Sequence, residues 1–502
     1  MNAEMVRVRL EPLAVEIDAP RDALLQPFLA EYGVEFPCGG EGICGGCSVR
    51  ALSGWLPITD ADFRHLSPQE LVDGWRLACH ARAGGPLAIE CGQWRMDVLS
   101  DVSPLAGAGK HGLGIAIDLG TTTIAAQMID MASGEVLALK TMLNPQSSWG
   151  SDVMSRIRAA LEGADLTTPI RAALNGVVAR LAAGREREIA EVVLAGNTVM
   201  HHLFCGLDIE PLSHVPFVST HLDEQRFGPR ELGWELPEDC AVRFAPCIGG
   251  FVGADILAGI IAVGMAQSDD LVALFDLGTN GEIAIGNRHG IVCASTAAGP
   301  AFEAGAIRMG MRAVTGAVSH VSFSDGSLHA TIIGNAPPRG ICGSGLVDAV
   351  AAGLRTGVVL PSGRIADKAK VFPIAEPVVV YQSDVRELQL AKGAIAAGFK
   401  LVLREVGAAV DQLKSIYLAG AFGNYIQIDS AIAIGLLAAP KHIIRGAGNT
   451  ALRGAKMLLM QQTPPLLPEI RHISLAADHG FQDEFAACMA FPEPANLKEL
   501  SN

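Results

Sequence analysis

The order of apolar and polar positions divides the chain into a short N-terminal part and a long remainder. The stretch "VRVRLEPLAVEID", from Val6, alternates apolar and polar residues and predicts two short strands. The following "PRDALLQPFLAEYG" predicts a helix, and "WRLACHARAGGPLAIEC", from Trp75, predicts a strand carrying Cys79, then a turn and a last strand. These elements predict a small α+β domain with a long loop after its helix.

A strand–turn–strand unit occurs twice in the remainder of the chain. The first copy is "LGIAIDLGTTTIAAQMIDMASGEVL", from Leu113, and the second is "LVALFDLGTNGEIAIGNRHGIV", from Leu271. Both contain an apolar strand ending in Asp-Leu-Gly-Thr, a tight turn and a second strand. This repeat predicts a duplicated α/β domain whose two halves face each other across a cleft.

A stretch rich in Gly, Ala, Ser and Pro, "SDVSPLAGAGKHGLG", separates the two parts and predicts a linker. We therefore expect an N-terminal domain at residues 1–95 and a linker at residues 96–113. The first lobe of the duplicated domain is expected at 114–250. The second lobe is expected at 251–502, with its C-terminal end returning toward the first.

Composition narrows the class of protein. The 502 residues include 38 basic and 53 acidic side chains, a formal net charge of −15, which argues against a nucleic-acid or anionic-membrane binder. The first twenty residues carry charges where a signal peptide would be apolar, and the apolar run "ILAGIIAVGMA" is too short to span a bilayer. These features predict a soluble, cytoplasmic protein.

Cysteines gather near the N-terminus. The stretch "CGGEGICGGC" places three cysteines and five glycines in ten residues, and with a fourth cysteine the spacing is Cys-x5-Cys-x2-Cys-x31-Cys. That arrangement is typical of [2Fe–2S] ligation in ferredoxins. The glycines permit positive φ angles and bring backbone N–H groups close to cluster sulfurs. The candidate ligands are Cys38, Cys44, Cys47 and Cys79.

Two alternatives concern the same cysteines. Zinc sites usually pair two Cys-x2-Cys units, and Cys79 has no such neighbour, so the spacing favours iron–sulfur over zinc. Cys91 is an alternative fourth ligand. We favour Cys79 because the preceding "RLAC" resembles the strand that carries the last ligand in ferredoxins. The remaining cysteines lack ligand spacing and are expected to be buried small apolar residues.

The repeated turns suit a nucleotide phosphate. Asp118 and Asp276 end apolar strands and could hold Mg²⁺ directly or through water. The turns that follow offer glycine for close approach, and hydroxyl, amide and N–H donors for phosphate oxygens. Ordinary β-hairpin turns are the alternative for either copy alone, but the duplication favours a nucleotide. The candidate residues are Gly120, Thr121, Thr122, Thr123, Gly278, Thr279 and Asn280.

A third element, "SIYLAGAFGNYI", runs from an apolar strand into small residues that would let an adenosine lie against backbone. Its candidates are Gly420, Ala421, Phe422 and Gly423. Together the three elements resemble the phosphate-1, phosphate-2 and adenosine motifs of the actin/sugar-kinase/Hsp70 superfamily. "GGFVGADILAGIIAVG" resembles the helix that connects the lobes in that superfamily. The resemblance implies a two-lobed actin-like, ribonuclease-H-like ATPase after a β-grasp-like ferredoxin domain.

Several further residues are candidates for the nucleotide site. Asp255, at the start of the expected connecting helix, could orient Mg²⁺ or the attacking water, or could simply interact with the helix dipole. Glu282 is a similar catalytic candidate. Glu303, and the Gly343-Ser344 turn that opens a helix, are expected to face the nucleotide; for Ser344 an N-cap role is the alternative.

Two polar segments have no assigned chemistry at this stage. His201 and His202 point in different directions on a helix, so we expect a structural role, with Asn197 or Thr198 as the N-cap. The stretch "NPQSSWGSDVMSRI" predicts a turn and then a helix with Asp152, Arg156 and Arg158. The sequence does not decide whether this helix faces a partner or the cleft.

A [2Fe–2S] domain fused to this ATPase fold resembles the reductive activators of corrinoid proteins. "LAGNTVMHHLF", "AGPAFEAGAIRMGM" and "GICGSGLVDAV" are also similar to that family, so the resemblance covers nearly the whole chain. It implies that the protein uses ATP to pass one electron from its cluster to Co(II), regenerating Co(I) for methyl transfer.

The resemblance also implies partners. They are a corrinoid protein of a methyltransferase or demethylase system and an upstream donor, such as reduced ferredoxin, flavodoxin or a reductase; a homodimer stays open. Two other functions fit the residues. One is a small-molecule kinase with a redox-sensing ferredoxin domain, and the other is a non-enzymatic, ATP-gated redox-sensing module.

Overall fold

The computed structural model describes most of the chain, and it packs into two compact units. The described residues are 4–11, 15–30, 34, 42, 47–66, 68–90, 105, 110–150, 152–278, 280–313, 316–335, 337–461, 466–478 and 480–493. One unit comprises Met1–Asp97, Gly120–Ile124 and Thr141–Leu174, and the other comprises the rest of the chain.

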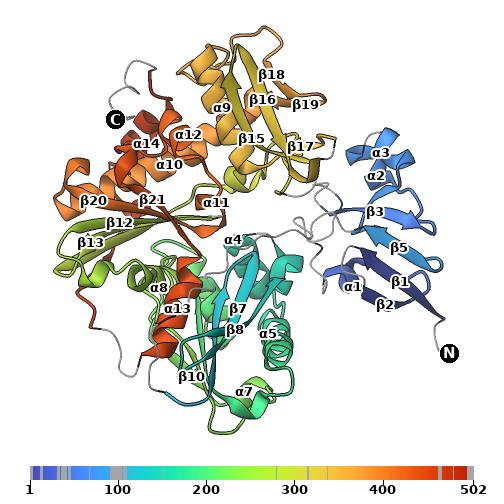
Figure 1. Ribbon diagram of the computed structural model, residues 1–502, viewed down its shortest axis with the longest axis vertical. Helices are drawn as coiled ribbons and strands as arrows, with labels where there is room; N and C mark the ends of the chain where they lie inside the picture. The colour runs from blue at the N-terminus through green and yellow to red at the C-terminus, as the bar shows by residue number, and fades with distance from the viewer. Residues whose placement is uncertain are drawn as a thin grey trace. The chain divides into compact units, whose positions relative to one another are not determined.

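A five-stranded sheet forms the centre of the N-terminal domain (Figure 1). Its order is β2-β1-β5-β3-β4, with β1 and β5 parallel and the other neighbours antiparallel. Val6, Val8 and Leu10 of β1 are buried while the alternate residues are exposed, which confirms the predicted strand. The strands are β1 Met5–Glu11, β2 Val15–Pro20, β3 Ser48–Ser53, β4 Trp75–Leu77 and β5 Leu87–Glu90.

Three short helices accompany this sheet: α1 Gln26–Ala30, α2 Asp60–His65 and α3 Pro68–Val72. Asp62 of α2 is buried and closes a capping box with Thr59, whose backbone N–H donates to the carboxylate at 2.7 Å. The other oxygen of Asp62 accepts from the backbone N–H of Leu77 at 2.6 Å. Strand β4 ends at Leu77, so Cys79 lies in the turn that follows. The prediction that the strand itself carries Cys79 is therefore wrong.

The remainder of the chain contains two six-stranded sheets. One has the order β10-β11-β9-β6-β7-β8 and the other β21-β20-β12-β13-β14-β22. The first sheet consists of β6 Leu113–Leu119, β7 Thr123–Asp130, β8 Val136–Leu143, β9 Ile189–Gly196, β10 Gln225–Phe227 and β11 Ala241–Phe244. The second consists of β12 Leu271–Leu277, β13 Gly281–Asn287, β14 Gly290–Thr296, β20 Leu413–Ala419, β21 Ile444–Gly448 and β22 Ile470–His472.

The two sheets repeat one topology. In each, three consecutive strands lie side by side, and the first of them pairs in parallel with a later strand: β6 with β9, and β12 with β20. That later strand pairs in parallel with a further one, β11 or β21. The repeat predicted from the Asp-Leu-Gly-Thr strands is therefore confirmed as a duplication of the sheet, which is the fold of an actin-like ATPase.

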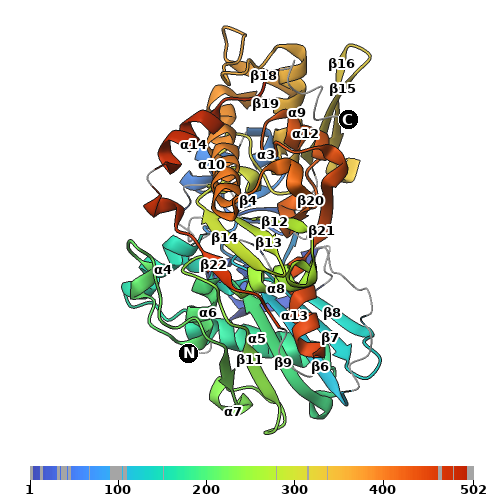
Figure 2. The ribbon, with the colours of Figure 1, turned by 90° about the vertical axis from the view of Figure 1, so that its left-hand side faces the viewer.

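Helices α8 Ala254–Ala262 and α13 Thr450–Met460 lie side by side in Figures 1 and 2. Their contact is close: a Cβ atom added at Gly454 of α13 would lie 2.0 Å from the carbonyl oxygen of Ala258 in α8. Helix α13 also packs on β6 and β9, although it comes from the C-terminal part of the chain. The predicted domain boundaries themselves stay a prediction.

The other helices cover the sheets or belong to smaller layers. Helix α10, 25 residues long, packs on β13, β14 and α14. The remaining helices are α4 Val153–Leu161, α5 Thr167–Ala182, α6 Thr198–Cys205, α7 Pro229–Leu232, α9 Gly343–Thr356, α10 Gln382–Val406, α11 Gly420–Gly423, α12 Ile428–Ala433 and α14 Phe481–Met489. Two small sheets contain β15 Ala317–Ser324, β16 Ser327–Ile332 and β17 Gly340–Ile341, and β18 Val371–Ala375 with β19 Val378–Tyr381. Of the helices described, none is both long and apolar enough to cross a membrane.

Asp62 offers a test of how the N-terminal domain holds its cysteine turn. We expect Asp62→Ala to lower the free energy of unfolding by about 2–4 kcal/mol, because it removes a helix cap and leaves the Leu77 N–H buried without its acceptor. Chemical denaturation followed by circular dichroism measures this. The matched change Asp60→Ala, at an exposed position of the same helix, should cost far less; equal losses would contradict the role given to Asp62.

Candidate functional site

The turn that carries Cys79 lies beside the start of β3. Cys47 and Cys79 are 1% and 2% exposed, and the backbone N–H of Ala78 donates to the carbonyl of Cys47 at 2.9 Å. Adjacent backbone therefore brings these two predicted ligands together, although they are distant in sequence. Cys38 and Cys44, and the alternative ligand Cys91, lie outside the described residues.

Gly42, from the cysteine loop, also lies at this turn. Its φ is +70°, and a Cβ atom there would lie 2.4 Å from Nε2 of His80, which follows Cys79. His65 Nε2 lies 3.1 Å from the carbonyl oxygen of Gly42. Gly42 therefore lies so close to His80, with a positive φ, that only glycine fits. This approach brings part of the Cys38–Cys47 loop next to Cys79, as a shared [2Fe–2S] cluster requires.

The first predicted phosphate turn, Gly120 to Thr123, is held by the segment that follows β8. The Asn144 backbone N–H donates to the carbonyl of Thr122 at 2.8 Å, and its side-chain amide donates to that of Gly120 at 2.9 Å. Arg156 of α4 donates to the carbonyl of Thr121 at 2.5 Å. Three successive carbonyls thus bond to donors of this segment, which fixes the shape of the turn.

Arg156 is a functional candidate that the sequence left undecided. Its side chain is completely buried, and it also donates to the carbonyl of Gly150 at 3.1 Å. Burial lowers the pKa of its guanidinium to about 9, so the group stays charged at neutral pH. In the sequence, Arg156 is only an arginine on a short helix after "NPQSSWGSD". Its role could not be predicted because the carbonyl groups to which it donates become its neighbours only in the folded chain.

Four carboxylates gather where the two repeated strands end. Asp118 and Asp276 are the next-to-last residues of β6 and β12. Asp255 lies in the first turn of α8, and Glu282 is opposite Asp276 in strand β13. Burial raises their pKa values, to about 7 for Asp118, about 8 for Asp255 and about 6 for Asp276. Repulsion by Asp276 adds to the effect on Asp118 and on Asp255.

Glu282 is the most buried of the four, at 8% exposure. Burial, and then the charges of Asp255 and Asp276, raise its pKa well above the ordinary range. The Ser295 hydroxyl donates to its carboxylate at 3.2 Å. Such a group of acids favours a bound cation. In the described part of the chain, however, no three acidic, histidine or cysteine side chains form a ready metal site, so a cation would need ligands from elsewhere, such as phosphate oxygens.

The predicted adenosine element lies against the second phosphate turn. Gly420 has φ +81°, and a Cβ atom there would lie 2.4 Å from Oδ1 of Asp276. Gly278 and Asn280 form the adjoining tight turn, with the Gly278 N–H donating to the carbonyl of Asn280 at 3.0 Å; Thr279 lies outside the described residues. Ala421, Phe422 and Gly423 continue from Gly420 as the short helix α11.

The Gly343-Ser344 turn packs against the same region through two aromatic rings. A Cβ atom at Gly343 would lie 1.7 Å from the carbonyl oxygen of Phe302, and the Phe302 ring stacks on that of Phe422 with centroids 4.5 Å apart. Ser344 does not cap α9: Cys342 is the N-cap residue, and the Ser344 hydroxyl donates to the carbonyl of Ser319 at 2.9 Å. The N-cap alternative for Ser344 is therefore wrong. Glu303 is exposed, and its contact with a nucleotide stays a prediction.

His201 and His202 have the structural role that the sequence favoured. Both are fully buried in α6, and the Asn197 side chain caps this helix by accepting from the Met200 N–H. His202 bonds to the carbonyl of Thr198 and to the hydroxyl of Ser219. Burial lowers the pKa of His201 to about 4. The cysteines without ligand spacing are buried as predicted: Cys205, Cys240, Cys247, Cys293, Cys342 and Cys488.

Three family models match successive parts of the chain: a 2Fe-2S iron-sulfur cluster binding domain at residues 8–84, the RACo middle region at 113–268, and the C-terminal ASKHA domain of RACo at 270–500. The corrinoid activation enzyme RamQ of Eubacterium limosum is 34% identical over 74% of this chain and 69% of its own length. The chain belongs to the family of corrinoid activation enzymes.

Two further similar proteins support the same family assignment. The [Co(II) methylated amine-specific corrinoid protein] reductase of Methanosarcina barkeri is 27% identical over 73% of each chain. The solved structure of a reductive activator for a corrinoid, iron-sulfur protein shares 26% identity, with a TM-score of 0.65 over 97% of this chain and 98% of that one. The family thus confirms the predicted fold class, a ferredoxin domain before an actin-like ATPase, and supports both a [2Fe–2S] cluster and ATP binding.

The buried acids of the activator predict an unusual pH dependence. Their folded-state pKa values lie above ordinary values, so the folded protein keeps protons that the unfolded chain releases, and stability should fall as pH rises from about 4 to 8. We expect Asp276→Asn to remove part of this loss and to stabilise the nucleotide-free protein by about 1–3 kcal/mol at pH 8, with little effect at pH 4, close to the ordinary pKa of an aspartate.

Thermal unfolding at the two pH values, without nucleotide, measures this difference. The exposed Asp325→Asn serves as the control, because it lies in a hairpin away from these acids and should give the same small shift at both pH values. A variant Asp276→Asn that is less stable than the wild type at pH 8 would contradict the raised pKa.

Arg156 should matter for ATP binding. Arg156→Met removes the donor to the Thr121 carbonyl, and we expect ATP affinity to fall about tenfold or more as the turn loosens. Isothermal titration with ATP and Mg²⁺ measures the affinity. Arg158→Met, an exposed change two residues along the same helix, is the control and should bind as the wild type does.

Proposed function

We propose that the protein uses ATP to reduce the Co(II) form of a corrinoid protein to Co(I). The bound [2Fe–2S] cluster supplies the single electron, and a separate donor, a reduced ferredoxin, a flavodoxin or a reductase, replaces it. One observation carries the proposal most: this member of the activator family combines buried, adjacent Cys47 and Cys79 with two repeated Asp-Leu-Gly-Thr strand ends on one chain. Cys38 and Cys44 are proposed to complete the cluster ligands with Cys47 and Cys79.

We infer that ATP is needed because corrinoid Co(II) is harder still to reduce than a [2Fe–2S] cluster, which makes the electron step unfavourable. Plant-type clusters have potentials of about −400 mV. For one electron, each deficit of about 59 mV lowers the equilibrium ratio of reduced to oxidised acceptor tenfold. ATP can change that ratio only by binding one conformation, or one complex with the corrinoid protein, better than another. We infer that the nucleotide favours the arrangement in which Co(I) is trapped.

The acidic residues are proposed to receive Mg²⁺ together with ATP. Asp118 and Asp276 would hold the ion directly or through water, with phosphate oxygens as further ligands, and the ion would offset the repulsion between these carboxylates. Asp255 is the first candidate for orienting the attacking water, because it lies in the first turn of α8 beside these two aspartates. Glu282 is the second candidate.

The remaining nucleotide contacts follow the superfamily motifs. The turn from Gly120 to Thr123 and the turn from Gly278 to Asn280 are proposed to receive the phosphates. Gly420, Ala421, Phe422 and Gly423 are proposed to lie against the adenosine, with Gly343, Ser344 and Glu303 nearby. The close contact between Gly420 and Asp276 supports this, because it brings an adenosine element next to a phosphate element.

The test is a single-turnover reduction assay. Reconstituted protein, chemically reduced at its cluster, is mixed with Mg²⁺-ATP and a corrinoid protein of a methyltransferase system held as Co(II), and cobalt is followed by visible spectroscopy. We expect Co(I) to form only with ATP. Cys79→Ser should abolish it, because the cluster loses a ligand, whereas Cys240→Ser, a change at a buried cysteine outside the cluster, should leave it intact.

Two results would count against the proposal. Reduction at the same yield without ATP would remove the need for the ATPase, and full activity of Cys79→Ser would remove the cluster from the electron path. A non-hydrolysable ATP analogue separates binding from hydrolysis: full reduction with the analogue shows that binding alone drives the electron step. Phosphorylation of a small molecule without any corrinoid protein would instead identify a kinase.

A further inference from the structure

Helix α13 begins at the acidic cluster. Asn449 precedes it, and the Asn449 side-chain amide donates to Oδ2 of Asp118 at 2.8 Å, across 331 positions of sequence. The side-chain oxygen of Asn449, Oδ1, accepts from the Leu452 N–H and caps the helix. One side chain therefore joins the start of α13 to the aspartate that ends β6. The negative charge that bears on Asp118 comes from Asp276, and Asp118 in turn bears on Asp255.

The same end of α13 is bonded to the adenosine element. The backbone N–H of Gly448 donates to Oδ1 of Asn424 at 2.8 Å, and the side-chain amide of Asn424 donates to the carbonyl of Gly420 at 2.7 Å. Gly420 in turn lies against Asp276. A continuous chain of contacts thus links α13 to both aspartates that end the repeated strands.

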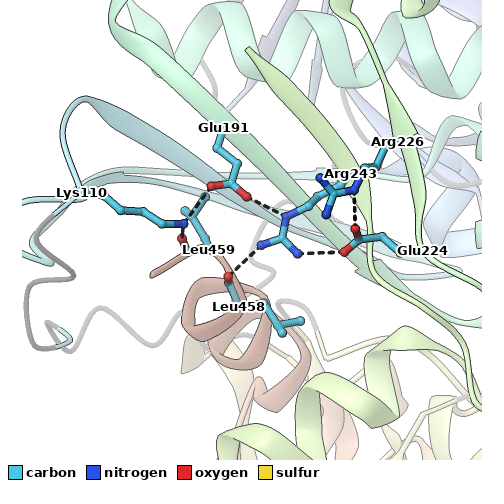
Figure 3. Close-up of polar contacts among 7 residues, drawn as sticks. All are labelled: Lys110, Glu191, Glu224, Arg226, Arg243, Leu458 and Leu459. Carbon is cyan, nitrogen blue, oxygen red and sulfur yellow. Dashed lines mark hydrogen bonds and ion pairs between the residues drawn. The ribbon is translucent and has the colours of Figure 1, made fainter. Parts of the chain in front are cut away.

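The opposite end of α13 is held by two cations (Figure 3). Lys110 donates to the carbonyl of Leu459 at 2.7 Å, and Arg243 donates to that of Leu458 at 2.8 Å. Cations at helix C-terminal carbonyls are favourable because they meet the negative end of the helix dipole. Glu191 lies between the two cations, 3.0 Å from Lys110 and 2.6 Å from Arg243, and Arg243 also pairs with Glu224.

Between its ends, α13 has little room to bend or slide. The near-contact of Gly454 with the Ala258 carbonyl fixes it on α8. A Cβ atom at Gly114 of β6 would lie 2.7 Å from the Leu459 side chain, so the C-terminal end is also tightly packed. A displacement of one end is therefore expected to move the other, because close-packed interiors transmit strain.

Lys110 lies in the segment that connects the ferredoxin domain to the ATPase. It falls between the matched 2Fe-2S domain, which ends at 84, and the RACo middle region, which begins at 113. The predicted linker, residues 96–113, contains it. The lysine that holds the end of α13 is therefore part of the covalent connection to the ferredoxin domain.

We propose that α13 is a rigid tether that couples the nucleotide site to the ferredoxin linker, with Asn449 and Lys110 as positioning residues at its two ends. The coupling to electron transfer rests on the proposed function; the tether itself does not. In this arrangement, a change at Asp118 or Gly420 on ATP binding moves α13. The movement then changes the contact between the C-terminal end of α13 and Lys110, and so the linker that contains this lysine.

An ordinary ion-pair cluster is the competing explanation. Exposed pairs contribute little to stability, but these side chains are only 13–25% exposed, and two of their bonds go to helix carbonyls. A purely structural cluster would change stability without changing how ATP affects the linker. The experiments therefore compare ATP responses and not stability alone.

The first experiment needs no corrinoid protein. Hydrogen–deuterium exchange of peptides covering residues 100–113 is measured with and without Mg²⁺-ATP. We expect ATP to change exchange there in the wild-type protein, and Asn449→Ser, which keeps a good helix cap but loses the donor to Asp118, to remove most of that change. No effect of ATP on these peptides in the wild type, or an unaltered effect in Asn449→Ser, would overturn the tether.

The second experiment measures coupling in the single-turnover reaction. Lys110→Met should retain ATP hydrolysis but lower the yield of Co(I) per ATP hydrolysed about fivefold or more, the scale of typical coupling energies. Lys110→Arg should restore it, and Lys140→Met, at an exposed lysine on β8, is the matched control. An unchanged yield per ATP in Lys110→Met would overturn the coupling.

The two experiments fail in different ways. If the wild-type protein shows no ATP-dependent reduction, the proposed function fails, while the exchange measurement still decides the tether. If Lys110→Met does not fold, Glu191→Gln replaces it, because this change keeps the size of the side chain but removes the charge between Lys110 and Arg243. The same fall in yield per ATP is expected.

Discussion

Repulsion among buried carboxylates is the constraint on which the rest of the structure depends. Asp118, Asp255 and Asp276 meet where two duplicated strands end; burial raises the pKa of all three, and the charge of Asp276 adds to the rise at Asp118 and Asp255. Nothing in packing alone favours such a group, because buried acids destabilise a protein unless a cation or proton accompanies them. The duplicated sheet is thus organised around a charge that a nucleotide with its metal ion would balance.

Glycine makes this arrangement possible. At Gly420, Gly343 and Gly454 a side chain would collide with a backbone or carboxylate oxygen, so each allows two segments to approach more closely than other residues permit. The three contacts join the adenosine element to Asp276, the α9 turn to Phe302, and α13 to α8. Close backbone approach, more than side-chain chemistry, brings distant motifs into one region.

Much of this could be predicted from the sequence, because the signals were local. The apolar strands ending in Asp118 and Asp276 repeat a pattern, and the alternation in β1 follows the pleat of a half-buried strand. Cys47 and Cys79 stood out by spacing alone. The family resemblance then linked the two parts, and the relatives confirmed it.

What could not be predicted depends on partners far away in sequence. Asn449 looks like any helix cap, and its bond to Asp118 spans most of the chain. Arg156 looks like a surface arginine until the carbonyls of a distant turn are placed around it. Ser344 suggested an N-cap because caps depend on helix register, and here α9 begins at Gly343, two residues earlier than that role requires.

The bracing of the first phosphate turn has a consequence for binding entropy. Asn144 and Arg156 already fix the carbonyls of Gly120, Thr121 and Thr122, and the arginine remains charged throughout the physiological pH range. The conformational freedom of this turn is therefore lost during folding and not when ATP arrives. If this turn receives a phosphate as proposed, the free energy of nucleotide binding is left for moving other parts of the molecule, which is what an ATP-driven activator requires.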